Sequence, residues 1–266
     1  MKKYLRFYIK PILIVLHFVI LFILIWGLSL CSVKNIMTSV IISDFKSKGV
    51  LNEELSTNTC KYYKVETSNP NEEPSFIHYA KDRDFPGMKA DILISTEAHL
   101  VNDLVSNFIS YTVGGHAAMC VDSSIQDGKY SSLTNDYIVE ATGMEDGENP
   151  TIISNKYYWT NNQTFNSMLV LRTNATKEQK DEVISNTLSM VDDLYNFSFL
   201  FNTKNRVYCS DLISKAYNSV GINLNKDGFQ TTVYDLIVSS ETYLSYYHYY
   251  EDGIKYIYYL GDYTTS

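Results

Sequence analysis

The sequence is poor in the patterns that mark several classes of protein. Its 266 residues include only five prolines and four cysteines, and we find no repeat and no low-complexity tract. A solenoid and a low-complexity chain are therefore excluded. With 45% hydrophobic and 14% aromatic residues, the chain beyond its N-terminus can form one domain of ordinary size with a full core.

Acidic residues are absent from the first 34 positions, which hold five of the 22 Lys and Arg residues. The remainder carries 17 basic and 30 acidic side chains, a formal charge of −13. Such a surface repels a phosphate backbone, so no nucleic acid partner is expected. Histidines are few and scattered, and no His-Glu-x-x-His spacing occurs. We therefore expect neither a metal site nor another cofactor.

Three cysteines, Cys60, Cys120 and Cys209, lie beyond the apolar N-terminal segment. An odd number leaves at least one thiol outside any intramolecular disulfide. Two arrangements remain open. Cys60 and Cys120 form a disulfide and leave Cys209 as a thiol, or all three are reduced and Cys120 fills a strand.

One long apolar segment is present, from Pro11 to Val33, and it contains no acidic or basic side chain. It is long enough to cross a bilayer as a helix, which takes about 20 residues. Four basic residues precede it: Lys2, Lys3, Arg6 and Lys10. Since such flanks stay on the cytoplasmic side, the pattern predicts a single-pass cell-membrane anchor with a cytoplasmic N-terminus and an extracytoplasmic remainder.

A cleaved signal peptide is the competing interpretation of this segment. Its apolar run exceeds the roughly 7 to 15 residues of a signal core, and no small-x-small cleavage site closes it. Lipidation of Cys31 is a further alternative, but Leu30 is bulky where a small residue is required. The sequence favours the uncleaved anchor.

Turn residues and hydrophobic periodicity divide the chain into four segments. These are a basic start and anchor (1–34), a stalk and irregular lead-in (35–87), a central domain (88–238) and a Tyr-rich C-terminal hairpin (239–266). Short apolar runs predict strands at 60–66, 90–95, 116–122, 136–141 and 168–172. Helices are predicted at 97–110, after a capping box of Thr176 and Gln179, and from Cys209 to a stop at Gly221. Asp252-Gly253 predicts the turn of the hairpin.

The chemistry-bearing residues are a histidine at the start of an apolar strand and a cysteine at the start of a helix. His116 follows Gly114-Gly115, and Cys209 follows Tyr208. Unsatisfied N–H groups at a helix N-terminus lower the pKa of a thiol below about 8.5 and hold an oxyanion. A thiol and an imidazole brought together by folding form a nucleophile and its base.

Six segments in a fixed order carry a family resemblance: Asp91-Ile92-Leu93, Gly115-His116-Ala117, Ile138-Val139-Glu140-Ala141, Val170-Leu171-Arg172, Tyr195-Asn196-Phe197 and Tyr208-Cys209-Ser210-Asp211-Leu212. Over about residues 88–238 the chain resembles the permuted papain-fold cysteine amidases of the YiiX type. These are relatives of NlpC-like peptidases and of lecithin retinol acyltransferase. The resemblance implies an α+β, papain-like, circularly permuted fold: an antiparallel sheet or small barrel packed against helices, here preceded by one transmembrane helix.

The resemblance also implies roles for individual residues. Cys209 would be the nucleophile, His116 its base, and Glu140 the carboxylate that orients the imidazole. Tyr208 and Ser210 would line the oxyanion or substrate site. Asp211 stands where relatives often have Glu, which weakens the assignment to a subgroup.

Together these features predict a membrane-anchored, extracytoplasmic cysteine hydrolase that cleaves an amide or ester through an acyl-enzyme. Cell-wall peptide is the first substrate expected. The alternatives are a lipid or lipoprotein acyl hydrolase or acyltransferase, acting on an acylated lipid or amine, and a non-catalytic envelope binding module. A cationic pocket of Lys204, Arg206 or Arg172 would favour wall peptide, whereas Phe197, Phe199 and Phe201 would favour an acyl chain.

Overall fold

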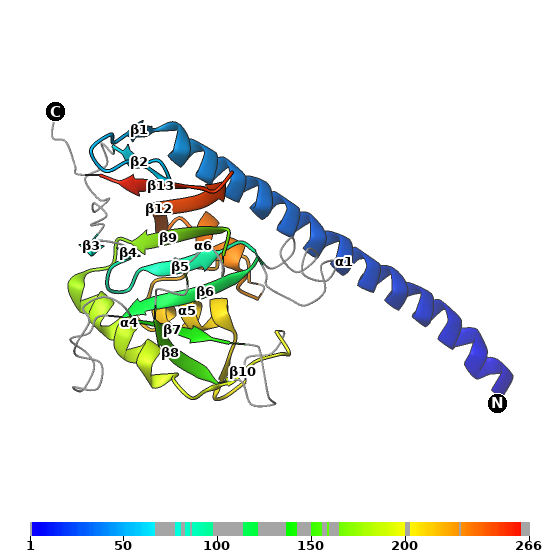
Figure 1. Cartoon of the computed structure of the whole chain (residues 1–266). Coiled ribbons are helices and arrows are strands. Elements are labelled where there is room, and N and C mark those ends of the chain that lie inside the picture. The colour runs from blue at the N-terminus through cyan, green and yellow to red at the C-terminus, as the bar shows by residue number, and fades with distance from the viewer. Residues whose placement is uncertain are drawn as a thin grey trace.

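The structure of the chain is a computed structural model. It describes residues 2–66, 78–80, 83–85, 87–97, 114–121, 137–142, 150–155, 159, 165–199, 203–228 and 230–261. In Figure 1 these residues form a body of strands and helices from which one long helix, α1, projects. The predicted α+β class is confirmed.

The elements follow the chain in the order labelled in Figure 1. The N-terminal half contains α1 (Lys2–Ser47), β1 (Gly49–Leu51), β2 (Cys60–Val65), β3 (His78–Ala80), β4 (Arg83–Phe85), β5 (Ile92–Ser95), β6 (His116–Val121) and β7 (Tyr137–Ala141). The remainder contains β8 (Thr151–Asn155), β9 (Ser167–Thr173), α4 (Lys177–Ser189), β10 (Leu194–Tyr195), β11 (Arg206–Val207), α5 (Cys209–Asn218), α6 (Val233–Val238), β12 (Thr242–Glu251) and β13 (Ile254–Leu260).

Nine of the described strands form one open sheet, in the order β1-β2-β13-β12-β9-β5-β6-β7-β8. Neighbours run antiparallel, except that β13 pairs with β2 in parallel from Lys255 opposite Cys60 to Leu260 opposite Val65. The sheet therefore corresponds to the predicted sheet and not to the barrel alternative. The parallel pair departs from the purely antiparallel pairing that we predicted.

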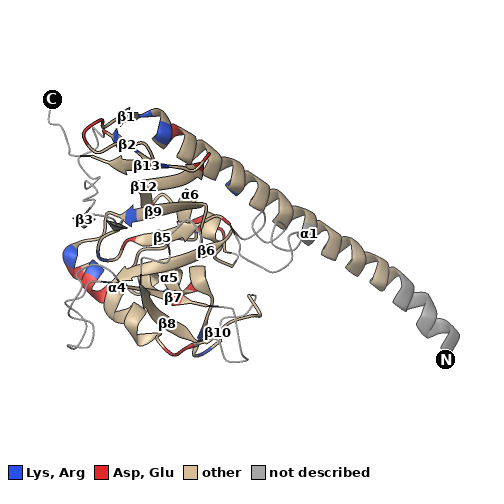
Figure 2. Ribbon diagram, viewed as in Figure 1, with Lys and Arg blue, Asp and Glu red and all other residues tan. Residues whose placement is uncertain are grey.

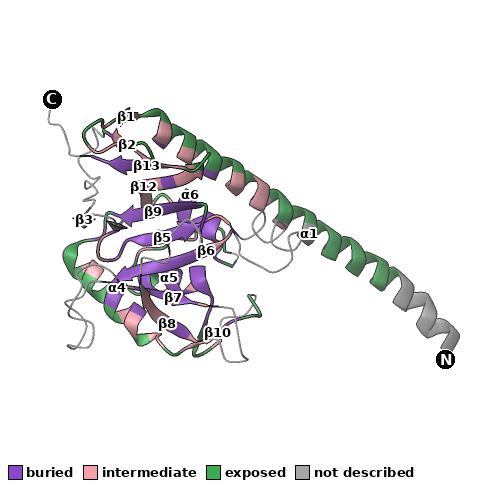
Figure 3. Cartoon of the chain, in the orientation of Figure 1, coloured by how far each residue is buried: buried purple, intermediate pink, exposed green. Residues whose placement is uncertain are grey.

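The central strands bury both faces of the sheet. In β5, Ile92 and Ile94 belong to one hydrophobic cluster and Leu93 to the other. In β6, Met119 and Cys120 divide in the same way. Side chains of a strand point alternately to opposite faces, so apolar runs without polar alternation are what a sheet covered on both sides requires. Figure 3 shows these strands as buried, except at the first residue of β6.

Helices α4, α5 and α6 contribute to one of these two clusters. The capping box that begins α4 is present: Thr176 accepts from the backbone of Gln179, whose side chain accepts from the backbone of Thr176. Helix α5 buries an apolar stripe at helical spacing: Leu212, Ile213, Ala216 and Tyr217. It packs on β6 and α4, which positions its N-terminus beside the start of β6.

Helix α1 is continuous from its basic start to the domain. From Pro11 onward the helix is long and apolar enough to cross a membrane. A signal sequence near the N-terminus would meet the same criteria of length and composition. In Figure 2 the ribbon of this part of the helix is coloured for few charged residues. Its C-terminal end packs on the domain. There Lys34 Nζ lies 2.5 Å from Asp227 and 2.5 Å from Asp235, and Lys46 Nζ lies 4.1 Å from the centre of the Tyr249 ring.

Most, but not all, of the predicted strands and helices can be compared with the structure. The structure confirms the Asp252-Gly253 hairpin and the two predicted helices that became α4 and α5. It also confirms, to within about two residues at most ends, the strands predicted at 60–66, 90–95, 116–122, 136–141 and 168–172. Most of the helix predicted at 97–110 lies outside the described residues. The hairpin contributes β12 and β13 to the interior of the sheet, where β12 pairs with β9. It is therefore continuous with the domain on which we expected it to pack. Cys60 and Cys120 are thiols, as the second cysteine arrangement has them.

A buried ion pair ties the start of β5 to β9. Arg172 Nε and Nη2 donate to the two carboxylate oxygens of Asp91 at 2.8 and 2.6 Å, and both side chains are 1% exposed. The Asp91 carboxylate also accepts from the Met88 backbone at 2.7 Å. Arg172 is therefore used inside the fold and does not contribute to a cationic substrate pocket, contrary to one option considered above.

Replacing Asp91 with alanine is expected to lower the free energy of unfolding by about 3–5 kcal/mol, because the Arg172 guanidinium would stay buried without this carboxylate. Urea unfolding of the full chain in detergent, followed by tryptophan fluorescence, measures the change. Asp44→Ala is the matched control. It removes an exposed pair with Lys48, which contributes at most about 1 kcal/mol. Equal losses in the two variants would contradict the structural role of Asp91.

Candidate active site

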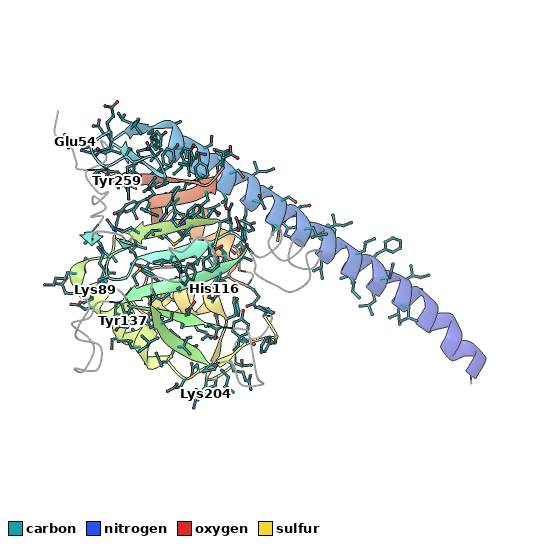
Figure 4. All side chains as sticks on the ribbon, viewed as in Figure 1. Glu54, Lys89, His116, Tyr137, Lys204 and Tyr259 are labelled. Carbon is teal, nitrogen blue, oxygen red and sulfur yellow. The ribbon has the colours of Figure 1, made fainter. Side chains whose placement is uncertain are left out.

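The structure brings the three predicted catalytic residues together from three elements. Cys209 opens α5, His116 opens β6, and Glu140 lies near the end of β7. The imidazole of His116, labelled in Figure 4, hydrogen-bonds to both Cys209 and Glu140. Cys209 and Glu140 follow His116 by 93 and 24 residues in the sequence (209 − 116 and 140 − 116), and the fold brings both to its ring.

Two glycines determine where β6 begins. Gly115 lies so close to β5 that an added Cβ would come within 2.2 Å of the Glu97 carbonyl oxygen and 2.5 Å of that of Ser95. Gly114 has a φ of +88° and packs against Val233, a conformation that a residue with a Cβ rarely adopts. These glycines therefore let the chain enter the strand tightly, with His116 as its first residue.

Strand register brings Glu140 to His116. Ala118 lies opposite Glu140 in the β6–β7 pair, so His116, two residues earlier on the same face, is its diagonal neighbour. His116 Nε2 lies 2.9 Å from Glu140 Oε2. Because Nε2 is occupied by the carboxylate, Nδ1 is the ring nitrogen left for the thiol. The carboxylate thereby fixes both the tautomer and the orientation of the imidazole.

Glu140 is largely buried and accepts from two further side chains. The Ser154 hydroxyl donates to Oε1, and Trp159 Nε1 donates to Oε2 at 3.3 Å. Burial alone would raise the pKa of Glu140, but the hydrogen bonds from His116, Ser154 and Trp159 lower it below its ordinary value. The group is therefore an anion at neutral pH and accepts from three donors.

Cys209 and His116 stabilise each other in their charged forms. Burial alone would lower the pKa of His116, but hydrogen bonds to Cys209 and Glu140 raise it to about 10. Burial also opposes ionisation of the thiol, yet the hydrogen bond and charge of His116 lower the pKa of Cys209. Each group therefore favours the charged form of the other, and a thiolate paired with an imidazolium is the reactive state of a cysteine nucleophile.

Backbone N–H groups surround the sulfur. Those of Ala117 and Ser210 donate to Cys209 and help to lower its pKa. Tyr208 is the N-cap of α5, and its side chain makes no capping hydrogen bond, so the first turn is open to an anion. The same donors suit the oxyanion of a tetrahedral intermediate.

Side chains of the two predicted oxyanion residues have other partners. The Ser210 hydroxyl donates to the Thr231 carbonyl at 2.8 Å, and the Tyr208 hydroxyl donates to Gln230 Oε1 at 3.2 Å. Both side chains therefore tie α5 to the segment before α6. For Ser210 it is the backbone N–H, not the hydroxyl, that faces the sulfur.

Sequence reasoning missed Trp159, which covers the imidazole. The Trp159 ring stacks on His116 at a centroid distance of 5.2 Å and packs against Phe165 at 4.7 Å. It is 1% exposed. By excluding water from one face of the ion pair, this ring strengthens the electrostatic interactions of His116 and Glu140. That the chain has only two tryptophans was the one available signal.

Tyr195, at the end of β10, is a second residue that was not assigned a role. Its hydroxyl hydrogen-bonds to Cys209. Burial and the negative charge of Cys209 raise the pKa of Tyr195. The phenol therefore stays protonated, and its O–H group is the donor of this hydrogen bond. Tyr195 is a positioning residue for the nucleophile.

The Tyr195→Phe variant is expected to slow acylation of Cys209 by about 10- to 100-fold, because a hydrogen bond to a charged group is worth about 1.5–3 kcal/mol. The pH at which the thiol is alkylated should rise, since the thiolate loses a donor. Alkylation rates across pH 5 to 9 measure this shift. Tyr63→Phe, in the stacked Tyr63–Tyr258 pair of the distant strand β2, is the control, and an identical profile in both variants would contradict the assignment.

Comparison with known proteins identifies the family of the chain. Residues 91–244, more than half of the chain, match the family described as permuted papain-like amidase enzymes, YaeF/YiiX, C92 family. None of the curated proteins compared with the chain matches it. A similar solved structure is described as metalloprotein yiiX from Escherichia coli O157:H7. It is 14% identical, with a TM-score of 0.43, and the match covers 59% of this chain and 94% of that one. Among the residues described here, no group of three or more His, Cys, Asp or Glu is arranged to hold a metal. By the family match, the chain belongs to the permuted papain-like amidases of the YaeF/YiiX type.

Proposed function

We propose that the chain is a cysteine hydrolase that cleaves an amide or ester bond through a thioester intermediate. The observation that carries this proposal is the hydrogen-bonded line from Cys209 through His116 to Glu140. A structural role of Cys209 would not explain the imidazole beside it. A structural role of His116 would not explain the buried carboxylate bound to the other side of its ring. The three groups together supply a nucleophile, an acid–base and an orienting anion.

The first half of the reaction forms the acyl-enzyme. Cys209 Sγ attacks the carbonyl carbon, a C–S bond forms, and the carbonyl electron pair moves to the oxygen, where the Ala117 and Ser210 N–H groups donate to it. As the intermediate collapses, the bond to the amine or alcohol breaks. The His116 imidazolium gives its proton to that leaving group and becomes neutral.

The second half releases the product. Neutral His116 takes a proton from water, the resulting hydroxide attacks the thioester carbon, and the C–S bond breaks. The carboxylic acid leaves, and Cys209 and His116 return to the thiolate and imidazolium pair. Throughout, Glu140 holds the ring and stabilises its positive charge.

We propose further that α1 is an uncleaved membrane anchor with the domain on the extracytoplasmic side. The helix continues past its apolar segment into contacts that belong to the domain. Besides the Lys34 ion pairs, Asn35 donates to the Tyr234 hydroxyl at 3.0 Å, and Phe45 is buried in the core. A helix that forms part of the core supports retention more than removal. The basic residues before Pro11 support the cytoplasmic N-terminus.

Cell-wall peptide stays a substrate predicted from the sequence. Of the three cations considered for a pocket that would bind it, Arg172 is used by Asp91. Lys204 and Arg206 remain exposed near the nucleophile helix.

Alkylation of the thiol across pH 5 to 9 tests the proposed chemistry. In the full chain in detergent, iodoacetamide should modify Cys209 well below the pH of about 8.5 at which an ordinary thiol titrates, because its pKa is lowered. Cys60, followed by mass spectrometry in the same sample, serves as the internal reference. In His116→Ala the profile of Cys209 should move to higher pH.

A Cys209 that reacts only together with Cys60, above about pH 8.5, would contradict the hydrolase. It would support the non-catalytic binding module instead. Trapping of an acyl-cysteine of the expected mass at Cys209 after addition of an activated ester distinguishes a reactive thiol from a thiol that also turns over.

A further inference from the structure

A continuous aromatic surface leads from the solvent to the nucleophile. The ring centroid of Phe197 lies 4.8 Å from that of Tyr195, and the ring centroid of Phe199 lies 6.0 Å from Tyr195 and 5.3 Å from Tyr208. Phe197 is 58% exposed and Phe199 40%. We call these four residues, Tyr195, Phe197, Phe199 and Tyr208, the aromatic patch.

The inner edge of the aromatic patch touches the reacting group. Tyr195 hydrogen-bonds to Cys209, and Tyr208 directly precedes it. A molecule that lies along Phe197 and Phe199 therefore has one end at the sulfur. Phe197 and Phe199 pack against Tyr195 and Tyr208 on one side only, and the area that stays exposed is available to a ligand.

The segment that carries the patch is held in shape. Strands β10 and β11 pair in parallel, with Tyr195 opposite Val207, and so join its two ends beside α5. Within it, buried Asn196 accepts from the Ser198 backbone at 3.2 Å and from the Ser198 hydroxyl at 2.7 Å. The two phenylalanines are thus presented by a fixed turn, and a fixed surface binds at lower entropic cost.

Charged side chains flank the patch. Lys204 and Arg206 are exposed, and Lys204 projects from the surface in Figure 4. Asp192 and Asp193 directly precede β10, whose Leu194 lies opposite Arg206, so the polar rim of the patch carries charges of both signs. An apolar surface with a charged rim complements a molecule with an apolar chain and a polar head group.

The proposed anchor lies near the same site. Lys34, directly after the apolar segment of α1, pairs with Asp227 and with Asp235 of α6. The segment between these two residues accepts, at Thr231, the hydrogen bond from Ser210 next to the nucleophile. The end of a bilayer-length segment is therefore linked through one short stretch of chain to the active site.

We propose that the substrate is an acylated amphiphile, and that its acyl chain lies along Phe197 and Phe199 while its carbonyl reaches Cys209. This inference rests on the proposed hydrolase. The acyl group is transferred to Cys209 as a thioester, and the amine or alcohol of the polar head leaves with the proton of His116. Water then releases the fatty acid by the second half-reaction.

Two p-nitrophenyl esters, the acetate and the dodecanoate, test the proposal on the full chain in detergent. Release of p-nitrophenolate gives kcat/KM for each. In the double variant Phe197→Ser/Phe199→Ser, the dodecanoate value should fall by about tenfold or more relative to the acetate value, since contact with a few methylenes contributes that much. The acetate value should stay near that of the parent, because the catalytic residues are untouched.

Val50→Ser/Leu51→Ser is the matched control. These two residues of β1 are also exposed, 63% and 42%, but lie at the opposite edge of the sheet from β8. The ratio of the two esters should be unchanged in this variant. A patch variant whose ratio equals that of the parent, or which loses both esters equally, would overturn the acyl-chain site while leaving the hydrolase intact. A parent that hydrolyses neither ester would overturn both.

Discussion

Replacing Cys209 with alanine is expected to reduce hydrolysis of p-nitrophenyl acetate by about 10⁴-fold or more, to the rate of the detergent blank. Every covalent step of the proposed reaction passes through this sulfur. Removal of a nucleophile from a serine hydrolase costs a factor of about 10⁶ in kcat. The measurement is p-nitrophenolate release by the purified full chain at neutral pH.

The fold should survive this substitution. Cys209 is largely buried at the N-terminus of α5, and loss of one sulfur atom costs about 1 kcal/mol or less. Burial opposes the Cys209 thiolate, so removing this anion also removes a desolvation cost. Thermal unfolding should therefore shift little. Cys60→Ala, which removes a thiol from β2 and not from the active site, is the control and should retain parental activity. Full turnover by Cys209→Ala would remove the basis of the proposal.

Replacing Glu140 with glutamine is expected to lower kcat by about 10³- to 10⁴-fold while keeping the shape of the side chain. The carboxylate accepts from His116, Ser154 and Trp159. An amide has one oxygen, so its NH₂ group must face at least one of these donors. In every orientation the imidazolium loses the negative charge that stabilises it, and the corresponding acid-to-amide substitution costs about 10⁴ in a comparable triad.

The pH dependence of Cys209 alkylation separates this role from a merely structural one. Glu140 raises the pKa of His116. Without that charge the imidazolium is less stable, so the thiolate loses its own partner, and the pKa of Cys209 should rise towards that of an ordinary thiol. The alkylation profile of Glu140→Gln should therefore move to higher pH.

Ser154→Ala provides the control for Glu140. It removes a single donor to Oε1 and leaves the bond from His116 in place. We expect a loss of activity of about tenfold or less. If Glu140→Gln retained parental activity and an unchanged alkylation profile, Glu140 would be a structural carboxylate and the acid–base system would consist of two groups.

The candidate triad could be predicted because its signals are local. A cysteine after Tyr208 at the start of an amphipathic stretch, a histidine after two glycines, and a carboxylate in an apolar strand are each unusual within a few residues of sequence. The order of these segments then pointed to the family. Their meeting in space depends on strand register and on the packing of α5, and only the structure supplies these.

Trp159 and Tyr195 could not be assigned from the sequence, because no local sequence pattern predicts which residues they contact in the fold. Trp159 contacts His116 and Glu140, which lie on other elements. Tyr195 was noted as part of a family segment, yet its bond to Cys209 depends on the parallel pairing of β10 with β11. Parallel pairing of β2 with β13 escaped prediction for the same reason: pattern and turn residues predict hairpins, whereas a parallel pair leaves no signal at its ends.

The pairing of β2 with β13 also bears on how the chain is made. Cys60 lies opposite Lys255, so 195 further residues (255 − 60) must be synthesised after Cys60 before β13 can begin to pair with β2. Until then β2 and β12 each present an open edge, to which strands of other nascent chains can add. Translation that stops before Ile254 yields a protein with every residue of the triad but with β2 and β12 each unpaired along one edge, so synthesis of β13 is a condition for one continuous sheet.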